Sequence, residues 1–139
     1  MKILKISLIL TIISCFTFSC SSDDSPSTEE NAAKLIGTWK LTSETEDGAS
    51  IQLDTCELLY TIIISSTQIT SKDYYGDNCE IEDSYSITYS LKGNTITTTE
   101  DGETYNSTII TLNSTTLSIE SSYEEDGETY TYTETYTKQ

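Results

Sequence analysis

The chain has 139 residues and a formal net charge of −16 at pH 7, with 23 acidic residues, seven Lys, no Arg and no His. Nucleic-acid binding needs Lys and Arg for the phosphates, so this composition excludes nucleic acid as a partner and argues against peripheral binding to anionic lipid. The length suffices for one domain and not for two.

The first 19 residues have the features of a lipoprotein signal peptide. A basic start precedes an apolar run that is shorter than the about 20 residues needed to span a bilayer. Thr-Phe-Ser-Cys, ending at Cys20, resembles a lipobox, whose cysteine is lipidated after cleavage. Cys15 is the rival site, but a polar segment begins directly after Cys20. We therefore predict residues 1–19 as signal peptide and membrane attachment through Cys20; an ordinary secreted protein with a free cysteine is the alternative.

An acidic, Ser-rich tether is predicted over residues 20–33, because this stretch carries too little apolar surface to fold. Ser-Ser-Asp-Asp-Ser at 21–25 resembles the acidic signal that sends Bacteroidetes lipoproteins to the cell surface, and a solvated linker is an equally compatible interpretation. We expect an outer-membrane lipoprotein exposed at the cell surface. Glu30 to Leu35 are predicted to form one helical turn.

Residues 34–139 have the pattern of an all-β domain. Thr, Ile, Tyr and Ser dominate, and apolar residues alternate with polar ones, as in strands with one wet face. Short connections rich in Gly, Asn and Asp join the strands into a meander, and closure into a barrel would remove its edges. We predict about eight strands, at 36–45, 58–65, 68–75, 83–92, 94–100, 104–112, 115–123 and 128–138.

The first predicted strand contains Ile-Gly-Thr-Trp-Lys-Leu-Thr at 36–42, with the only tryptophan of the chain. Together with the later Cys56-Glu57 pair and a second cysteine after a Tyr-rich segment, it resembles the lipocalin-like lipoproteins of Bacteroidetes-type bacteria. The resemblance extends over residues 33–138. It implies an eight-stranded antiparallel up-and-down barrel, in a family whose members mostly have no assigned activity.

Cys56 and Cys79 lie in the first and third predicted connections. An exported protein meets oxidising conditions, so two remaining cysteines are expected to form a disulfide. A zinc site is the weaker alternative, because the chain has no His and no third cysteine after Cys20 to complete a ligand set.

An acidic rim is predicted at one end of the barrel. In an eight-strand meander the odd-numbered connections share one end, and these connections together with the strand ends that border them hold 17 of the 23 acidic residues. They also hold both cysteines and three Glu-Asp-Gly turns, at 46–48, 100–102 and 125–127. We expect this rim to be the open mouth, with the tether at the closed end. Clustered carboxylates can bind calcium, although the spacing matches no EF-hand loop.

The inward side chains of an eight-stranded barrel either fill it or hold one small ligand. Tyr85, Tyr89, Tyr130, Tyr132 and Tyr136 suit a wet wall or an amphipathic ligand, and Tyr130 and Tyr132 are alternatively partners on the outer face. The predicted barrel lining comprises Trp39, Leu41, Ile62, Ile64, Tyr85, Ile87, Tyr89, Leu91, Ile110, Leu112, Leu117 and Ile119.

Enzymatic function is not expected, because the chain has no His, no cysteine free to act as a nucleophile and no Gly-x-Ser-x-Gly motif. No cofactor is predicted. Two functions remain. The first is a barrel that binds a small apolar or amphipathic molecule, which the family resemblance favours. The second is a non-enzymatic surface interaction protein with a solid barrel, whose acidic rim binds a partner or divalent cations.

Overall fold

The computed structural model describes residues 28–139. The predictions for the signal peptide, Cys20 and the acidic signal lie outside these residues. Within 28–139, no helix combines the length and the apolar run that crossing a membrane requires. The elements are α1 (Thr28–Leu35), β1 (Gly37–Glu46), β2 (Ala49–Ile51), the 3-10 helix η1 (Glu57–Leu59), β3 (Thr61–Ile64), β4 (Gln68–Tyr75), β5 (Ile81–Lys92), β6 (Thr95–Glu100), β7 (Glu103–Leu112), β8 (Thr116–Glu125) and β9 (Glu128–Lys138).

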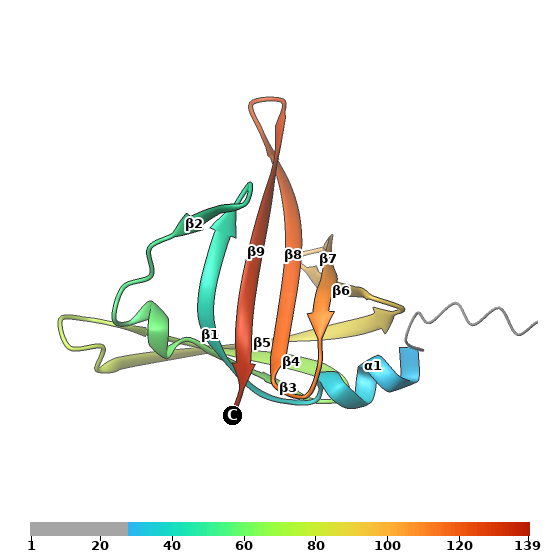
Figure 1. Cartoon of the computed structure of the whole chain (residues 1–139), viewed down its shortest axis with the longest axis horizontal. Coiled ribbons are helices and arrows are strands. Elements are labelled where there is room, and N and C mark those ends of the chain that lie inside the picture. Colours follow the sequence, from blue (N-terminus) through green and yellow to red (C-terminus); the bar gives the residue numbers. More distant parts are fainter. Residues whose placement is uncertain (1–27) are drawn as a thin grey trace, which may run out of the picture.

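The strands form a closed antiparallel barrel in which each strand from β3 to β9 pairs with the next along the chain. The barrel closes because β1 pairs with both ends of this series, with β3 from Gly37 to Lys40 and with β9 from Trp39 to Glu46. This confirms the predicted eight-stranded up-and-down barrel (Figure 1). The short strand β2 is an addition to it, paired only with the end of β1.

One end of the barrel splays apart. β5 pairs with β6 only from Tyr89 to Lys92, and β7 pairs with β8 only from Ser107 to Leu112. Beyond these paired residues, the β4–β5 hairpin and the β6–β7 hairpin separate from each other and from the hairpin of β8 and β9 (Figure 1). The barrel is therefore closed at one end and flared at the other.

The connection between β1 and β3 fills one of the gaps at the flared end. β1 leaves β3 after Lys40, and the backbone N–H of Leu41 donates to the Tyr60 carbonyl at 3.0 Å, which ends the contact between them. Cys56, just before η1, forms a disulfide with Cys79 in the β4–β5 connection, with the two Cα atoms 5.2 Å apart. The predicted disulfide is confirmed. It holds the η1 segment against the neighbouring hairpin.

The three Glu-Asp-Gly turns lie at the flared end, as predicted. They join β1 to β2, β6 to β7 and β8 to β9, and in each copy both Asp and Gly have positive φ. Two consecutive residues with positive φ make a tight hairpin turn whose twist matches the strands, which explains the repeated Asp-Gly pair without a ligand.

Helix α1 covers the closed end, opposite the β8–β9 turn (Figure 1). It begins at Thr28, two residues earlier than the predicted helical turn, and its Asn31 is only 2% exposed. The Asn31 side chain donates to Asn94 Oδ1 at 2.8 Å, and the Thr28 hydroxyl accepts from the N–H of Gly93 at 2.9 Å. The folded domain therefore begins before the predicted boundary at residue 34, within the predicted tether.

A single core occupies the closed half of the barrel. Tyr89, Leu91 and Leu112 are partly buried against it, whereas Ile87 is partly exposed and lies outside it. Leu35, Ile96 and Ile109 were not among the predicted lining residues, and Tyr136 was named only as a tyrosine suited to a wet wall or an amphipathic ligand. The buried apolar residues are Leu35, Trp39, Leu41, Ile62, Ile64, Ile96, Ile109, Leu117, Ile119 and Tyr136.

Two predicted lining residues are exposed. The prediction for Ile110 is wrong: this side chain is 54% exposed, while Ile109 is 4% exposed. A register shift between Ile109 and Thr111 reverses the alternation at this point, as a β-bulge does. Tyr85 is 49% exposed because it stands in the flared half, where its hydroxyl reaches across the gap to Glu100 Oε1 at 2.9 Å.

Candidate functional site

The barrel contains two adjoining pockets above the core. The inner pocket has a volume of about 140 Å³ and an apolar floor, and it is lined by Tyr60, Ile62, Ile69, Ile96, Thr98, Ser107, Ile119, Glu134 and Tyr136. The outer pocket has a volume of about 300 Å³ and lies under the η1 segment, lined by Leu41, Glu44, Cys56, Glu57, Tyr60, Asp73, Tyr74, Tyr132 and Glu134. Tyr60 and Glu134 line both, so we treat the two pockets together as the lumen.

A third pocket opens onto the lumen where β7 and β8 separate. It has a volume of about 550 Å³ and shares Ser107 with the inner pocket and Tyr132 with the outer pocket. We call it the gap pocket; its other lining residues are Thr104, Tyr105, Asn106, Ser121, Ser122 and Tyr123. The barrel is therefore hollow in its flared half, and the prediction of a solid barrel is not supported.

Strand β9 supplies the polar wall of the lumen. Side chains alternate between the two faces of a strand, and β9 pairs with β8 without a register shift from Glu128 to Thr137. Tyr130, Tyr132, Glu134 and Tyr136 consequently share the inner face. The alternative that placed Tyr132 on the outer face is wrong, because Tyr132 lines two of the pockets. Tyr130 lines none of the three pockets and stacks on its cross-strand partner Tyr123.

Glu134 is the carboxylate at the junction of the two lumen pockets. Burial raises its pKa, the neighbouring Glu44 carboxylate raises it further, and a hydrogen bond from the Tyr136 hydroxyl opposes both effects. The carboxyl group thus occupies a site where its charged form is poorly solvated and has no cationic partner among the lining residues. Glu134 was not among the residues predicted from the sequence, although the alternation of 130, 132, 134 and 136 places it on the same face as three tyrosines.

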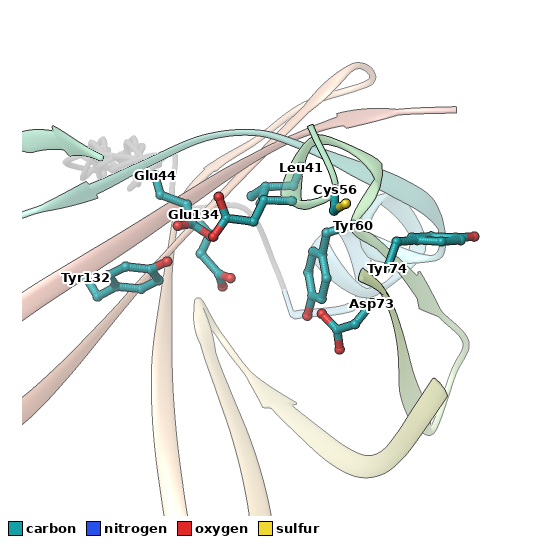
Figure 2. Close-up of a pocket in the computed structure, with 9 residues that line it drawn as sticks. Leu41, Glu44, Cys56, Tyr60, Asp73, Tyr74, Tyr132 and Glu134 are labelled. Atoms are coloured by element: carbon teal, nitrogen blue, oxygen red, sulfur yellow. The ribbon is translucent and has the colours of Figure 1, made fainter. Parts of the chain in front are cut away.

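Three tyrosines surround this carboxylate. The rings of Tyr60 and Tyr136 lie 6.3 Å apart between centroids, and the Tyr132 hydroxyl hydrogen-bonds the Glu44 carboxylate. Burial is the largest cause of the raised pKa of each of these hydroxyls, followed by nearby carboxylates for Tyr60 and Tyr136. Figure 2 shows Glu44 and Glu134 between the ring of Tyr132 on one side and that of Tyr60 on the other.

The described lysines lie away from the lumen. Lys138 is at the closed end, where its Nζ stands 4.8 Å from the centroid of the Trp39 ring and donates to the Lys34 carbonyl at 3.0 Å. Lys72 pairs with Glu82 at 2.8 Å, and neither residue lines the lumen. Within residues 28–139, none of the residues that line the three pockets is basic.

The acidic residues described at the flared end do not form a metal site. In the described part of the chain no group of three or more Asp, Glu, Cys or His side chains is arranged to hold a metal ion. The calcium prediction therefore gains no support from the geometry. What the lumen offers instead is an apolar floor, aromatic rings, hydroxyls and carboxylates, a combination suited to a small molecule with an apolar body and a polar group.

Comparisons with known proteins agree with the barrel. The family described as "Lipocalin-like domain" matches residues 35–119. The crystal structure of a lipocalin-like protein from Bacteroides uniformis ATCC 8492 is similar to this chain, with a TM-score of 0.57 and 16% sequence identity. The similarity covers 76% of this chain and 99% of that one. At this identity the likeness shows the fold alone. No curated protein matches the chain.

Proposed function

The chain belongs to the lipocalin-like domain family, and we propose that it binds a small apolar or amphipathic molecule inside its barrel. The observation that carries this proposal is the lumen between the core and the η1 segment. Small barrels are either filled by side chains or hold one ligand, and here the flared half is unfilled. Binding without catalysis also fits a family whose members are generally non-enzymatic.

The size of the lumen limits the ligand. The outer pocket, at about 300 Å³, stands at the lower end of the volumes typical of small-molecule sites, and the inner pocket adds about 140 Å³. A short alkyl chain or a single ring would fit against Ile62, Ile96 and Ile119, with its polar group toward Tyr60 and Glu134. Long acyl chains exceed the inner pocket.

We also propose that the protein is an outer-membrane lipoprotein exposed at the cell surface and attached through Cys20. Residue 28 lies at the closed end of the barrel, so the preceding segment joins the domain there. The lumen opens at the opposite end, which would face away from the membrane. Metabolic labelling with a fatty acid tests this: a C20S variant should lose the label and C15S should keep it. A labelled C20S protein would overturn the assignment.

A pair of matched variants tests binding in the lumen. Thr98 lines the inner pocket, whereas its neighbour Thr99 is exposed and lies on the opposite face of β6. T98F should fill the inner pocket and T99F should leave it open, with both residues in a strand that accepts aromatics. In NMR titrations with hexan-1-ol, the native protein and T99F should bind and T98F should not. Equal binding by T98F would place the alcohol elsewhere and overturn the proposal.

A further inference from the structure

We propose that the lumen is selective for organic cations: small molecules that carry a protonated amine or a quaternary ammonium on a short apolar body. This inference rests on the proposed function and names the chemical class of its ligand. It is carried by the composition and the geometry of the lumen wall.

The wall is anionic and has no compensating charge. Glu44, Glu57, Asp73 and Glu134 line the outer pocket, and none of its lining residues is basic. An anionic ligand would bring a further negative charge among these carboxylates in a site of reduced solvation, which is costly. A neutral ligand would leave the charge at Glu134 uncompensated, and a cation would neutralise it.

The aromatic rings around Glu134 favour the same class of ligand. A cation over the face of a tyrosine ring is attracted by the ring quadrupole, and aromatic side chains surrounding a cation are the usual site for ammonium groups. Tyr60 and Tyr132 stand on either side of the carboxylates in Figure 2, and Tyr136 packs beside Tyr60. The rings and the carboxylates therefore act on the same part of a ligand.

The position of Glu134 defines the orientation of such a ligand. Glu134 lines both pockets, and beyond it the inner pocket has walls of Ile62, Ile96 and Ile119. An ammonium group at Glu134 would point its apolar body into the inner pocket, whose volume of about 140 Å³ suits a chain of about six carbons at the packing density of protein interiors. The raised pKa of Glu134, caused mainly by burial, is in line with a carboxylate that a bound cation would stabilise.

Three probes with the same six-carbon chain separate charge from shape: hexylamine, hexan-1-ol and hexanoate. Each is titrated into the native protein at near-neutral pH, and binding is followed by NMR through the ring signals of Tyr60 and Tyr132. Hexylamine should bind about tenfold more tightly than hexan-1-ol, a difference of 1.4 kcal/mol, and hexanoate should not bind.

Two variants with the same loss of charge locate the effect. E134Q removes the carboxylate of the lumen, and E124Q removes an exposed carboxylate of β8 that lines none of the three pockets. E134Q should lose most of the preference for the amine, although Glu44, Glu57 and Asp73 remain in the outer pocket, and E124Q should retain the tenfold preference. If E134Q keeps the preference, general attraction to an acidic protein explains it and Glu134 does not.

The outcomes also separate this inference from the function on which it rests. If hexan-1-ol binds as tightly as hexylamine, the barrel binds small molecules but selectivity for cations is overturned. If none of the three probes binds, both the cation selectivity and the proposed barrel binding are overturned. Retained binding of hexan-1-ol by E134Q shows that this variant is folded.

Discussion

The Nε1 atom of Trp39 donates a hydrogen bond of 2.8 Å to the carbonyl oxygen of Leu35, and both side chains are 0% exposed. Leu35 is the last residue of α1, where carbonyl groups have no partner within the helix. The indole ring thus fills the closed end of the barrel, and its N–H provides a hydrogen-bond partner for a carbonyl at the C-terminal end of α1. One residue therefore links the first strand, the core and α1.

W39F should destabilise the protein. Phenylalanine leaves the Leu35 carbonyl without its donor and leaves part of the ring volume empty, and a lost partner for a buried group alone costs about 1–3 kcal/mol. Urea unfolding measures the free energy change. Y75F is the control, because Tyr75 is 51% exposed and should change little. If W39F unfolds at the same midpoint urea concentration as the native protein, the hydrogen bond and the packing of Trp39 do not stabilise the closed end of the barrel.

N31A tests whether α1 belongs to the folded domain. The Asn31 amide donates to Asn94 Oδ1 at 2.8 Å and to the Gly93 carbonyl at 3.3 Å from a buried position. Losing these bonds should cost about 1 kcal/mol even though alanine is the better helix former. The matched control is E29A in the same helix, at an exposed residue. If both variants have the same melting temperature, α1 does not stabilise the barrel.

The repeated turns and the alternation of apolar residues predicted a meander of about eight strands, and the family resemblance implied its closure into a barrel. The bounds of β4 and β9 agree with the predicted strands at 68–75 and 128–138. The bulge at Ile109–Thr111 could not be predicted, because two adjacent isoleucines leave the alternation ambiguous and only the pairing with β8 decides which one is buried. β2 and η1 were missed, since neither carries a clear periodic pattern.

The lumen was harder to predict than the fold. In β9 both faces look polar: one carries threonines, the other carries Tyr130, Tyr132, Glu134 and Tyr136. The alternation of tyrosine with threonine indicates which face is inner, but it does not show that Glu134 is buried, and the pairing of β9 with β1 and β8 places this carboxylate inside the barrel. Glutamate is rarely buried in a protein interior, so the burial of Glu134 could not be expected from its residue type. Buried polar residues of this kind are often found at functional sites.

Removal of the disulfide by C56S/C79S should lower the free energy of unfolding by about 3 kcal/mol, as expected for closure of a loop of 23 residues in the chain-entropy model. Urea unfolding of this double variant should match that of the native protein after reduction. Because the disulfide holds the η1 segment against the β4–β5 hairpin, its removal should also make this segment more mobile. Amide hydrogen exchange at 57–59 should then accelerate. Unchanged exchange would mean that Leu41 and Tyr60 hold the segment without the disulfide.

Glu134 should make the stability of the protein depend on pH in a direction opposite to that of a paired surface carboxylate. Its pKa is raised above the ordinary value of 4.5 by burial and by Glu44, against the opposing hydrogen bond from Tyr136. Between the ordinary and the raised pKa, the folded protein binds more protons at this site than the unfolded chain does. Stability from this group is therefore fully present below 4.5 and is lost as the pH rises through the raised value.

E134Q cannot ionise, so it should escape this loss. We expect E134Q to melt at a higher temperature than the native protein at about pH 8, and the two to melt at similar temperatures at about pH 4, where Glu134 is protonated in both states. E124Q, an exposed control with the same change of charge, reports the effect of reduced net charge alone. The other charged groups facing the site, Glu44, Glu57 and Asp73, are unchanged in all three proteins. If E134Q is less stable than E124Q at about pH 8, the hydrogen bond from Tyr136 outweighs the cost of burying the carboxylate, and Glu134 is part of a stabilising pair.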